Sequence, residues 1–212
     1  MGTVHASLGM SLDGFIAGRT PDRTMPWAMG VRIHRWVYDL EAWRERQGLA
    51  GGRINQDDEV SRETYERTGA FVRGRRMFDE GEVGWPDPPP FQAPVFVLTN
   101  HAREPWIRQS GTTFTFVTDG PGSALEQART AAGDKDIQIA GGANTIQQFL
   151  EAGLLDELQI HLAPLLLGDG VRLFEHIHPE RVELEPTRVI DSPRVTHLRY
   201  RVVASENGGL EV

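Results

Sequence analysis

The chain has 212 residues, 39% of them hydrophobic and 25% charged, a composition typical of a folded globular domain. The formal net charge of −8 argues against a nucleic-acid or membrane-surface partner, and the absence of cysteine excludes disulfides and cysteine-ligated metal. No apolar run reaches the roughly 18 residues of a membrane span, and the first residues lack the basic and apolar regions of a signal peptide. We therefore expect a single domain over residues 1–212, in the cytoplasm.

The first half of the chain alternates strand and helix signals. The predicted elements, in chain order, are a strand at 3–10, a turn at 11–18, a helix at 31–46, a helix N-terminus at 57–59, a strand at 69–72 and a helical turn at 75–80. The helix at 31–46 rests on apolar side chains at helical spacing. The three acidic residues at 57–59 suit the positive end of a helix dipole.

The second half continues the alternation and ends in strands. The predicted elements are strands at 94–98 and 113–117, a helix at 123–132, a strand before the glycine pair at 141–142, a helix from there to about 152, and strands around 158–162 and 198–202. Ser123 and Glu126 have the spacing of a capping box at a helix start. Alternating elements of this kind favour an α/β layered fold.

The glycine pair Gly141-Gly142 separates a buried strand from a helix. Two glycines at such a switch let a ligand approach the backbone, and the helix behind them directs unpaired N–H groups and its positive dipole end at that ligand. The segment therefore suits a diphosphate. A Gly-Gly turn is equally typical of an ordinary tight loop, and this spacing is not the dinucleotide fingerprint of doubly wound dehydrogenases.

Two more strand ends carry groups that suit a nucleotide. Arg75 and Arg76 follow Gly74, and arginine is the preferred bidentate partner of phosphate. Thr99 and Arg103 follow another strand, with an amide side chain between them that suits a ribose or its phosphate. Each segment alone also fits a solvated polar turn. Because ligands of open α/β sheets bind at the carboxyl ends of strands, the three segments together favour one site.

Other catalytic constellations are weaker. Asp13 lies in the turn after the first strand, which makes it the best candidate for a site acid, although an Asp-Gly pair is also ordinary turn chemistry. His176 and His178 have no carboxylate at a ligand spacing, so we expect no metal site. No Gly-x-Ser-x-Gly elbow occurs in the chain, which argues against a serine hydrolase.

An ordered set of short motifs covers most of the chain. These are SLDGFIA at 11–17, GRRMF at 74–78, VLTN at 97–100, AGGA at 140–143, GLLDEL at 153–158 and APLLLGDG at 163–170. In this order they resemble the dihydrofolate reductase-like superfamily, and within it the branch related to the riboflavin-biosynthesis reductase domain. The resemblance implies an α/β fold with a mixed sheet of about eight strands flanked by helices.

The same resemblance implies an NADPH-dependent reductase that works as a homodimer on a small-molecule substrate. It implies that the glycine pair and the following helix start receive the pyrophosphate, while the other two segments hold the adenosine half and its 2′-phosphate. The expected cofactor-binding residues are Gly74, Arg75, Arg76, Thr99, Asn100, Arg103, Gly141, Gly142, Ala143, Asn144 and Thr145. Asp13 is the expected proton donor, directly or through water.

Two departures from the family pattern bear on the substrate. The riboflavin-pathway reductases carry a glutamate directly before the glycine pair, where this chain has Ala140. The chain is similar to dihydrofolate reductases at Pro26-Trp27, but the helix that follows has no carboxylate at residues 31–33. Our interpretation is hydride transfer to a small heterocyclic substrate. The alternative is a non-catalytic nucleotide- or ligand-binding protein that keeps the fold.

Overall fold

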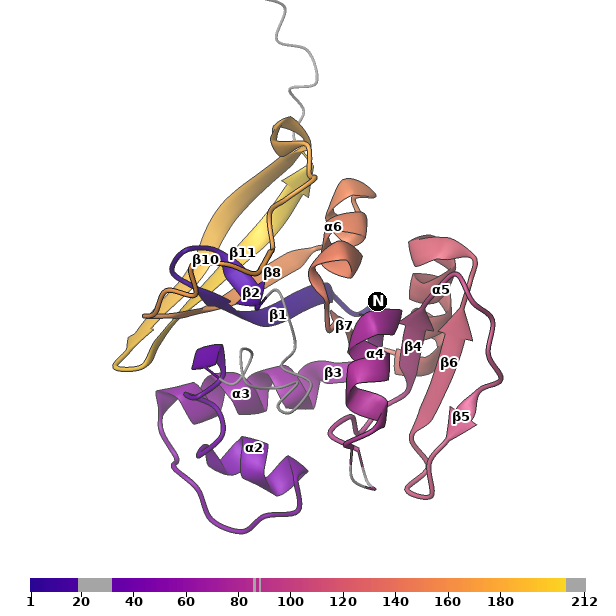
Figure 1. Ribbon diagram of the computed structural model, residues 1–212, viewed down its shortest axis with the longest axis horizontal. Helices are drawn as coiled ribbons and strands as arrows, with labels where there is room; N and C mark the ends of the chain where they lie inside the picture. Colours follow the sequence, from indigo (N-terminus) through magenta and orange to yellow (C-terminus); the bar gives the residue numbers. More distant parts are fainter. Residues whose placement is uncertain (19–31, 86, 88, 205–212) are drawn as a thin grey trace, which may run out of the picture.

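The computed structural model describes residues 1–18, 32–85, 87 and 89–204. Its main element is a nine-stranded mixed sheet (Figure 1). In spatial order its strands are β10 (Val182–Ser192), β11 (Val195–Ala204), β8 (Glu157–Ala163), β1 (Val4–Ser11), β7 (Asp136–Ile139), β3 (Thr68–Gly74), β4 (Val95–Leu98), β6 (Thr113–Val117) and β5 (Trp106–Ile107). A separate small sheet pairs β2 (Phe15–Ala17) with β9 (Val171–Arg172). The predicted fold class is confirmed, with nine strands in place of about eight.

The centre of the large sheet is parallel and its edges are antiparallel. β1 pairs in parallel with both β7 and β8, and β3 pairs in parallel with β7 and β4. β11 runs antiparallel to β8 and to β10, and β5 runs antiparallel to β6. The carboxyl ends of β7, β3 and β4 therefore meet at one edge, where three of the predicted motifs follow them.

Helices cover both faces of the sheet. They are α2 (Glu41–Arg46), α3 (Gln56–Arg67), α4 (Arg75–Glu82), α5 (Gly120–Ala132) and α6 (Ala143–Glu151), with a 3-10 turn at Pro179–Arg181. In Figure 1, α6 lies on one side of β1, and α2 and α3 lie on the other. α5 and α6 bury an apolar core against the sheet that includes Leu125, Phe149 and Ile139. None of the described helices is long and apolar enough to cross a membrane.

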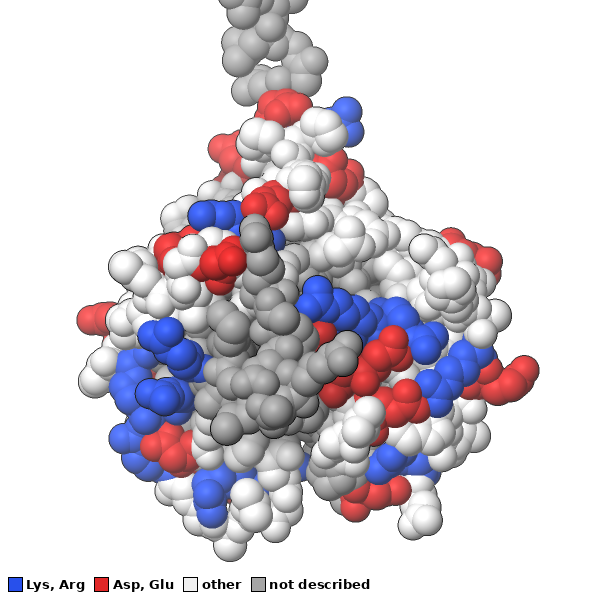
Figure 2. Space-filling view, in the orientation of Figure 1, with Lys and Arg blue, Asp and Glu red and all other residues white. Residues whose placement is uncertain are grey.

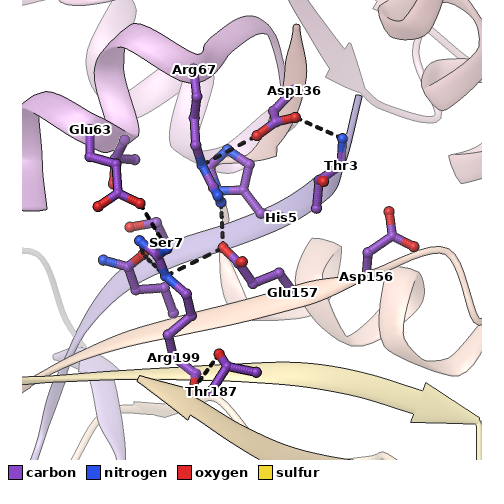
Figure 3. A network of polar contacts seen from close by, with 12 residues as sticks. Thr3, His5, Ser7, Glu63, Arg67, Asp136, Asp156, Glu157, Thr187 and Arg199 are labelled. Carbon is purple, nitrogen blue, oxygen red and sulfur yellow. Dashed lines mark hydrogen bonds and ion pairs between the residues drawn. The ribbon is translucent and has the colours of Figure 1, made fainter. Parts of the chain in front are cut away.

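The opposite face of the sheet is mixed in character. Under α4, an aromatic cluster forms around Phe78 and Phe114. Under α3, a polar network joins helix and sheet (Figure 3). Its centre is Arg67, which contacts Glu157 on β8 and, at 3.3 Å, Asp136 on β7. Neighbouring Arg199 of β11 pairs with Glu63 of α3 at 2.7 Å and donates to Gln159 of β8 at 3.1 Å.

Two helix predictions are wrong in extent. The helix expected at 31–46 begins only at Glu41, because Leu40 is extended and forms a bridge with Arg53. Residues 32–33 are helical, but residues 34–39 form turns that bury Trp36 against the sheet. The helix expected from Ser123 begins at Gly120 instead, so Ser123 lies inside α5 and caps nothing. The acidic residues at 57–59 do begin α3, which is capped by the side chain of Asn55.

Candidate functional site

The three segments singled out in the sequence follow three neighbouring parallel strands. Val72 of β3 pairs with Ile139 of β7, and Gly74 of β3 pairs with Leu98 of β4. The loops after these strands therefore lie side by side at the carboxyl edge of the sheet. The fold thus brings together segments 74–76, 99–103 and 141–145, as expected for ligand sites in open sheets. The residues at 19–31, which include Pro26-Trp27, lie outside the described residues.

Two glycines at this edge are required by the fold. The Gly74 N–H donates to the Gly141 carbonyl at 2.9 Å, so the two loops touch through their backbones. A Cβ on Gly74 would lie 2.6 Å from Thr145 Oγ1, closer than packing allows. Gly141 has φ +89°, in the region that favours glycine.

Gly142 differs from its neighbour because the fold does not demand a glycine there. Its φ is −69°, and a Cβ would meet Met77 Sδ at 3.7 Å, an ordinary contact. A side chain at this position would thus be tolerated by the protein itself. The bare backbone at Gly142 is consistent with close approach of a ligand.

Two helices begin at this point. Gly142 is the N-cap of α6 and Gly74 is the N-cap of α4, and within the described residues neither helix start receives a side-chain hydrogen bond. A Cβ on Gly74 would be 3.8 Å from the Gly142 nitrogen, so the two N-termini adjoin. Free N–H groups and two positive dipole ends at one place make a site for an anion with several oxygens.

The predicted arginines are present but already paired. Arg75 contacts Asp79 at 2.6 Å and Arg76 contacts Glu80 at 2.9 Å, each one turn along α4. Arg103 makes a bidentate pair with Glu82, a third acid of α4. This pair lowers the pKa of the Glu82 carboxyl group. Figure 2 shows basic and acidic side chains interleaved over this region. The arginines are therefore less free to bind phosphate than the sequence motif indicates.

The strand end after β4 offers backbone and amide groups. Thr99 is buried, and its Oγ1 accepts the His101 N–H at 3.1 Å, which shapes the loop. Asn100 next to it is exposed. Of this pair, Asn100 is the side chain open to a ligand, while Thr99 holds the turn.

Asp13 lies in the turn between β1 and β2. Its carboxylate accepts the Ser11 hydroxyl at 2.6 Å and the N–H groups of Leu167 and Gly168, the latter at 2.7 Å. These bonds, led by the one from Ser11, lower the pKa of Asp13 to about 2. They stabilise the ionised form and tie the turn to the segment after β8. A proton donor at neutral pH needs the opposite, so the geometry favours a structural role.

Other candidate sites are less suited to chemistry. A groove of about 330 Å³ lies between α2, α3 and residues 92–93, lined in part by Thr68 and Lys135. Those residues mark the amino ends of β3 and β7, the edge opposite the glycine pair. Across the described residues, no group of three or more His, Asp or Glu side chains could hold a metal ion.

Sequence reasoning missed a set of buried polar side chains next to this edge. Trp36 covers two imidazoles, those of His161 and His197, which contact each other at 2.6 Å between their Nδ1 atoms. In the sequence, His161 is only a polar residue within the predicted strand around 158–162. Its partner lies 36 residues away, and no local spacing links the two.

Comparison with known proteins gives a consistent result. Residues 2–198 match the family model of the RibD C-terminal domain. The riboflavin biosynthesis protein RibD of Corynebacterium ammoniagenes is 44% identical over 46 residues, which cover 22% of this chain and only 14% of that protein. A putative riboflavin biosynthesis protein from Shewanella sp. PV-4 has a similar structure, with TM-score 0.65 and 23% identity over 96% of this chain and 99% of that one. The Saccharomyces cerevisiae riboflavin biosynthesis reductase Rib7 superposes with TM-score 0.56 and 13% identity over 95% and 90%.

Proposed function

The chain belongs to the RibD C-terminal domain family, and we propose that it is an NADPH-dependent reductase of a small heterocyclic compound. The observation that carries the proposal is the convergence of the α4 and α6 N-termini at the bare backbone of Gly142. This arrangement suits a dinucleotide diphosphate. Rib7, which shares the fold, is a riboflavin biosynthesis reductase, and that likeness supports the same class of chemistry.

The residues at the edge fit the cofactor in a defined order. The N–H groups of residues 142–144 would hold the diphosphate, since the Thr145 N–H already donates to the Gly142 carbonyl at 3.1 Å, and Asn100 would contact the adenosine half. Arg75, Arg76 and Arg103 would exchange part of their pairing with α4 carboxylates for the 2′-phosphate. Bound NADPH supplies the hydride. The role of the protein is then to orient the two reactants and to exclude water between them.

The Gly142→Val variant tests the site. Because a Cβ at this position makes only an ordinary contact with Met77, while the methyl groups of valine occupy the space next to the helix N-terminus, we expect the affinity for NADPH to fall more than about 100-fold, with the melting temperature little changed. Ala152→Val, at the exposed C-terminal end of the same helix, is the control and should bind normally. Fluorescence titration measures both. If a folded Gly142→Val protein binds NADPH with unchanged affinity, the glycine pair serves only as a turn and does not contact the cofactor.

The same titration with NADH tests the arginines. We expect NADPH to bind about 10- to 100-fold more tightly, the scale of one charge-assisted bond to the 2′-phosphate. The preference should be at the lower end of this range because each guanidinium gives up a carboxylate partner. Equal affinities for NADPH and NADH would show that these arginines do not bind the 2′-phosphate.

The source of the proton is tested by Asp13→Asn. If Asp13 donates the proton, turnover should fall by about 10²–10⁴. The hydrogen bonds on its carboxylate lead us to expect the other result, a lower melting temperature with near-normal turnover in the folded fraction. A large loss of turnover at unchanged melting temperature would restore Asp13 as the acid.

The alternative is a ligand-binding protein without turnover. It is favoured by one observation: Ala140 stands where riboflavin-pathway reductases carry a glutamate, and it packs against the aromatic cluster under α4. A metabolite screen that follows NADPH absorbance distinguishes the two. Binding without oxidation of NADPH by any carbonyl or imine compound would favour the ligand-binding protein without turnover.

Light scattering in the same buffer tests the expected homodimer against the monomer mass of 23.7 kDa.

A further inference from the structure

A chain of four hydrogen-bonded side chains runs from α3 into the sheet. Asp57 Oδ1 of α3 lies 3.0 Å from His197 Nε2 of β11. His197 Nδ1 lies 2.6 Å from His161 Nδ1 of β8, and His161 Nε2 lies 2.9 Å from Ser7 Oγ of β1. Four elements that are far apart in the sequence therefore contribute one group each to a continuous path.

The path is buried at one end and partly open at the other. Asp57, His197 and His161 are 2%, 3% and 7% exposed, whereas Ser7 keeps intermediate exposure. Trp36 lies against both imidazoles, with ring centroids at 4.8 and 5.0 Å. The path thus connects a buried carboxylate to the hydroxyl of a residue that is partly exposed.

Both imidazoles are neutral at physiological pH. Burial lowers the pKa of His161 well below its usual range, and the nearby positive charge of Arg199 acts in the same direction. Burial also lowers the pKa of His197, against the opposing effect of the Asp57 hydrogen bond, with a smaller lowering from Arg188. Each ring therefore carries one N–H and one acceptor nitrogen.

The carboxylate fixes which nitrogen carries each hydrogen. A carboxylate only accepts, so His197 must place its N–H on Nε2, which leaves its Nδ1 as an acceptor. His161 must then carry its hydrogen on Nδ1, which leaves its Nε2 as an acceptor. Ser7 consequently donates its hydroxyl hydrogen to His161. Every hydrogen in the path is directed towards Asp57, which leaves the lone pairs of Ser7 Oγ to accept a hydrogen bond.

Ser7 lies next to the proposed cofactor site. The residue before it, Ala6, pairs with Ile139, and Ile139 precedes Ala140 and the glycine pair. Ser7 is also on the same side of β1 as His5, the side that faces the polar network (Figure 3). A substrate bound against the cofactor at this edge would meet the Ser7 hydroxyl.

We propose that Ser7 is a substrate-binding residue that accepts a hydrogen bond from an N–H or O–H group of the substrate. The path through His161 and His197 to Asp57 holds Ser7 in this acceptor state and prevents it from acting as a donor. The substrate class is then a cyclic amide, imide or hydroxyl compound with a donor beside its reducible bond. This inference rests on the proposed reductase function for the position of the substrate.

The direction in which the hydrogen bonds of this path point depends on which ring nitrogen carries each hydrogen. ¹⁵N NMR of the histidines in the whole protein tests this. The expected result is an Nδ1–H tautomer for His161 and an Nε2–H tautomer for His197, unchanged between pH 7 and pH 8. An Nε2–H tautomer at His161 would reverse the path, make Ser7 a donor to the ligand, and overturn the proposal. This measurement needs neither cofactor nor substrate, so it is independent of whether the protein is a reductase.

The ligand contact is tested with paired probes. Succinimide and 2-pyrrolidinone carry a ring N–H, and their N-methyl counterparts do not. With NADPH present, we expect the first pair to shift the His161 signals at millimolar concentration and the methylated pair to shift them at least about tenfold less, the scale of one hydrogen bond. Ser7→Ala should abolish this difference, and Ser123→Ala on α5 should keep it. Equal shifts from both pairs, or no shift from either, would overturn the proposal. The proposed function fails separately, on the loss of NADPH binding or oxidation.

Discussion

One face of the sheet buries apolar side chains, whereas the part of the other face under α3 also buries polar ones. Under α5 and α6 the buried residues are apolar, and Phe149 and Leu158 are fully inaccessible there. Under α3 the sheet buries imidazoles, an amide and guanidinium groups that bond to one another. Apolar packing would stabilise that second face at least as well. The difference indicates that the first face holds the fold together, while the second keeps polar groups available next to the proposed site.

The largest loss of stability is expected from a substitution on the apolar face. Phe149→Ala removes a fully buried ring, and we expect the free energy of unfolding to fall by about 3–5 kcal/mol. Urea unfolding measures this change, and the loss should be the same at pH 5 and pH 7. A loss under about 1 kcal/mol would mean that α6 does not anchor this face.

On the polar face the expected loss is smaller. Arg67→Met keeps the packing of the side chain but leaves Glu157 and Asp136 without their shared cation. Because these groups are 17–21% exposed, water offsets part of the cost, and we expect a loss of about 1–3 kcal/mol. Glu157→Gln in the same background should recover part of it. Arg201→Met, which breaks an exposed pair with Glu185, is the control and should cost less than about 1 kcal/mol.

The smallest effect is a difference in pH dependence. Burial lowers the pKa of His5 from 6.5 to about 3, so the unfolded chain takes up this proton first as the pH falls. The contribution of His5 to the free energy of unfolding is fully present above pH 6.5 and is lost as the pH falls from 6.5 to about 3. Between pH 6.5 and pH 5 the wild type should lose about 1–2 kcal/mol more than His5→Gln. Parallel pH profiles of the two proteins would show that His5 already carries a charge in the fold.

The apolar face is also the part that sequence reasoning describes well. Alternating strands and the apolar spacing of α6 predicted the layers, because periodicity depends only on near neighbours. The order of motifs also identified which strand ends meet. The helix at 31–46 failed because Leu40 and Trp36 satisfy contacts with distant segments, a bridge to Arg53 and packing on two histidines.

The site itself was predictable only in outline. The segments that carry Gly74 and Gly142 were found because glycine marks a backbone requirement at a strand end. The pairing of Arg75 with Asp79 could have been foreseen from its spacing of four residues on a helix. The bond between His197 and Asp57 could not, since 140 residues separate them and both look like ordinary polar positions.

The position of β1 has a consequence for how the protein folds. This strand is made well before its two neighbours, β7 and β8, which lie more than 120 residues later in the chain. The centre of the sheet therefore closes only after a long loop is ordered, which slows folding. During synthesis, both edges of β1 stay unpaired until residue 139, the end of β7, has left the ribosome, and the edge that pairs with β8 stays unpaired until residue 163 has followed.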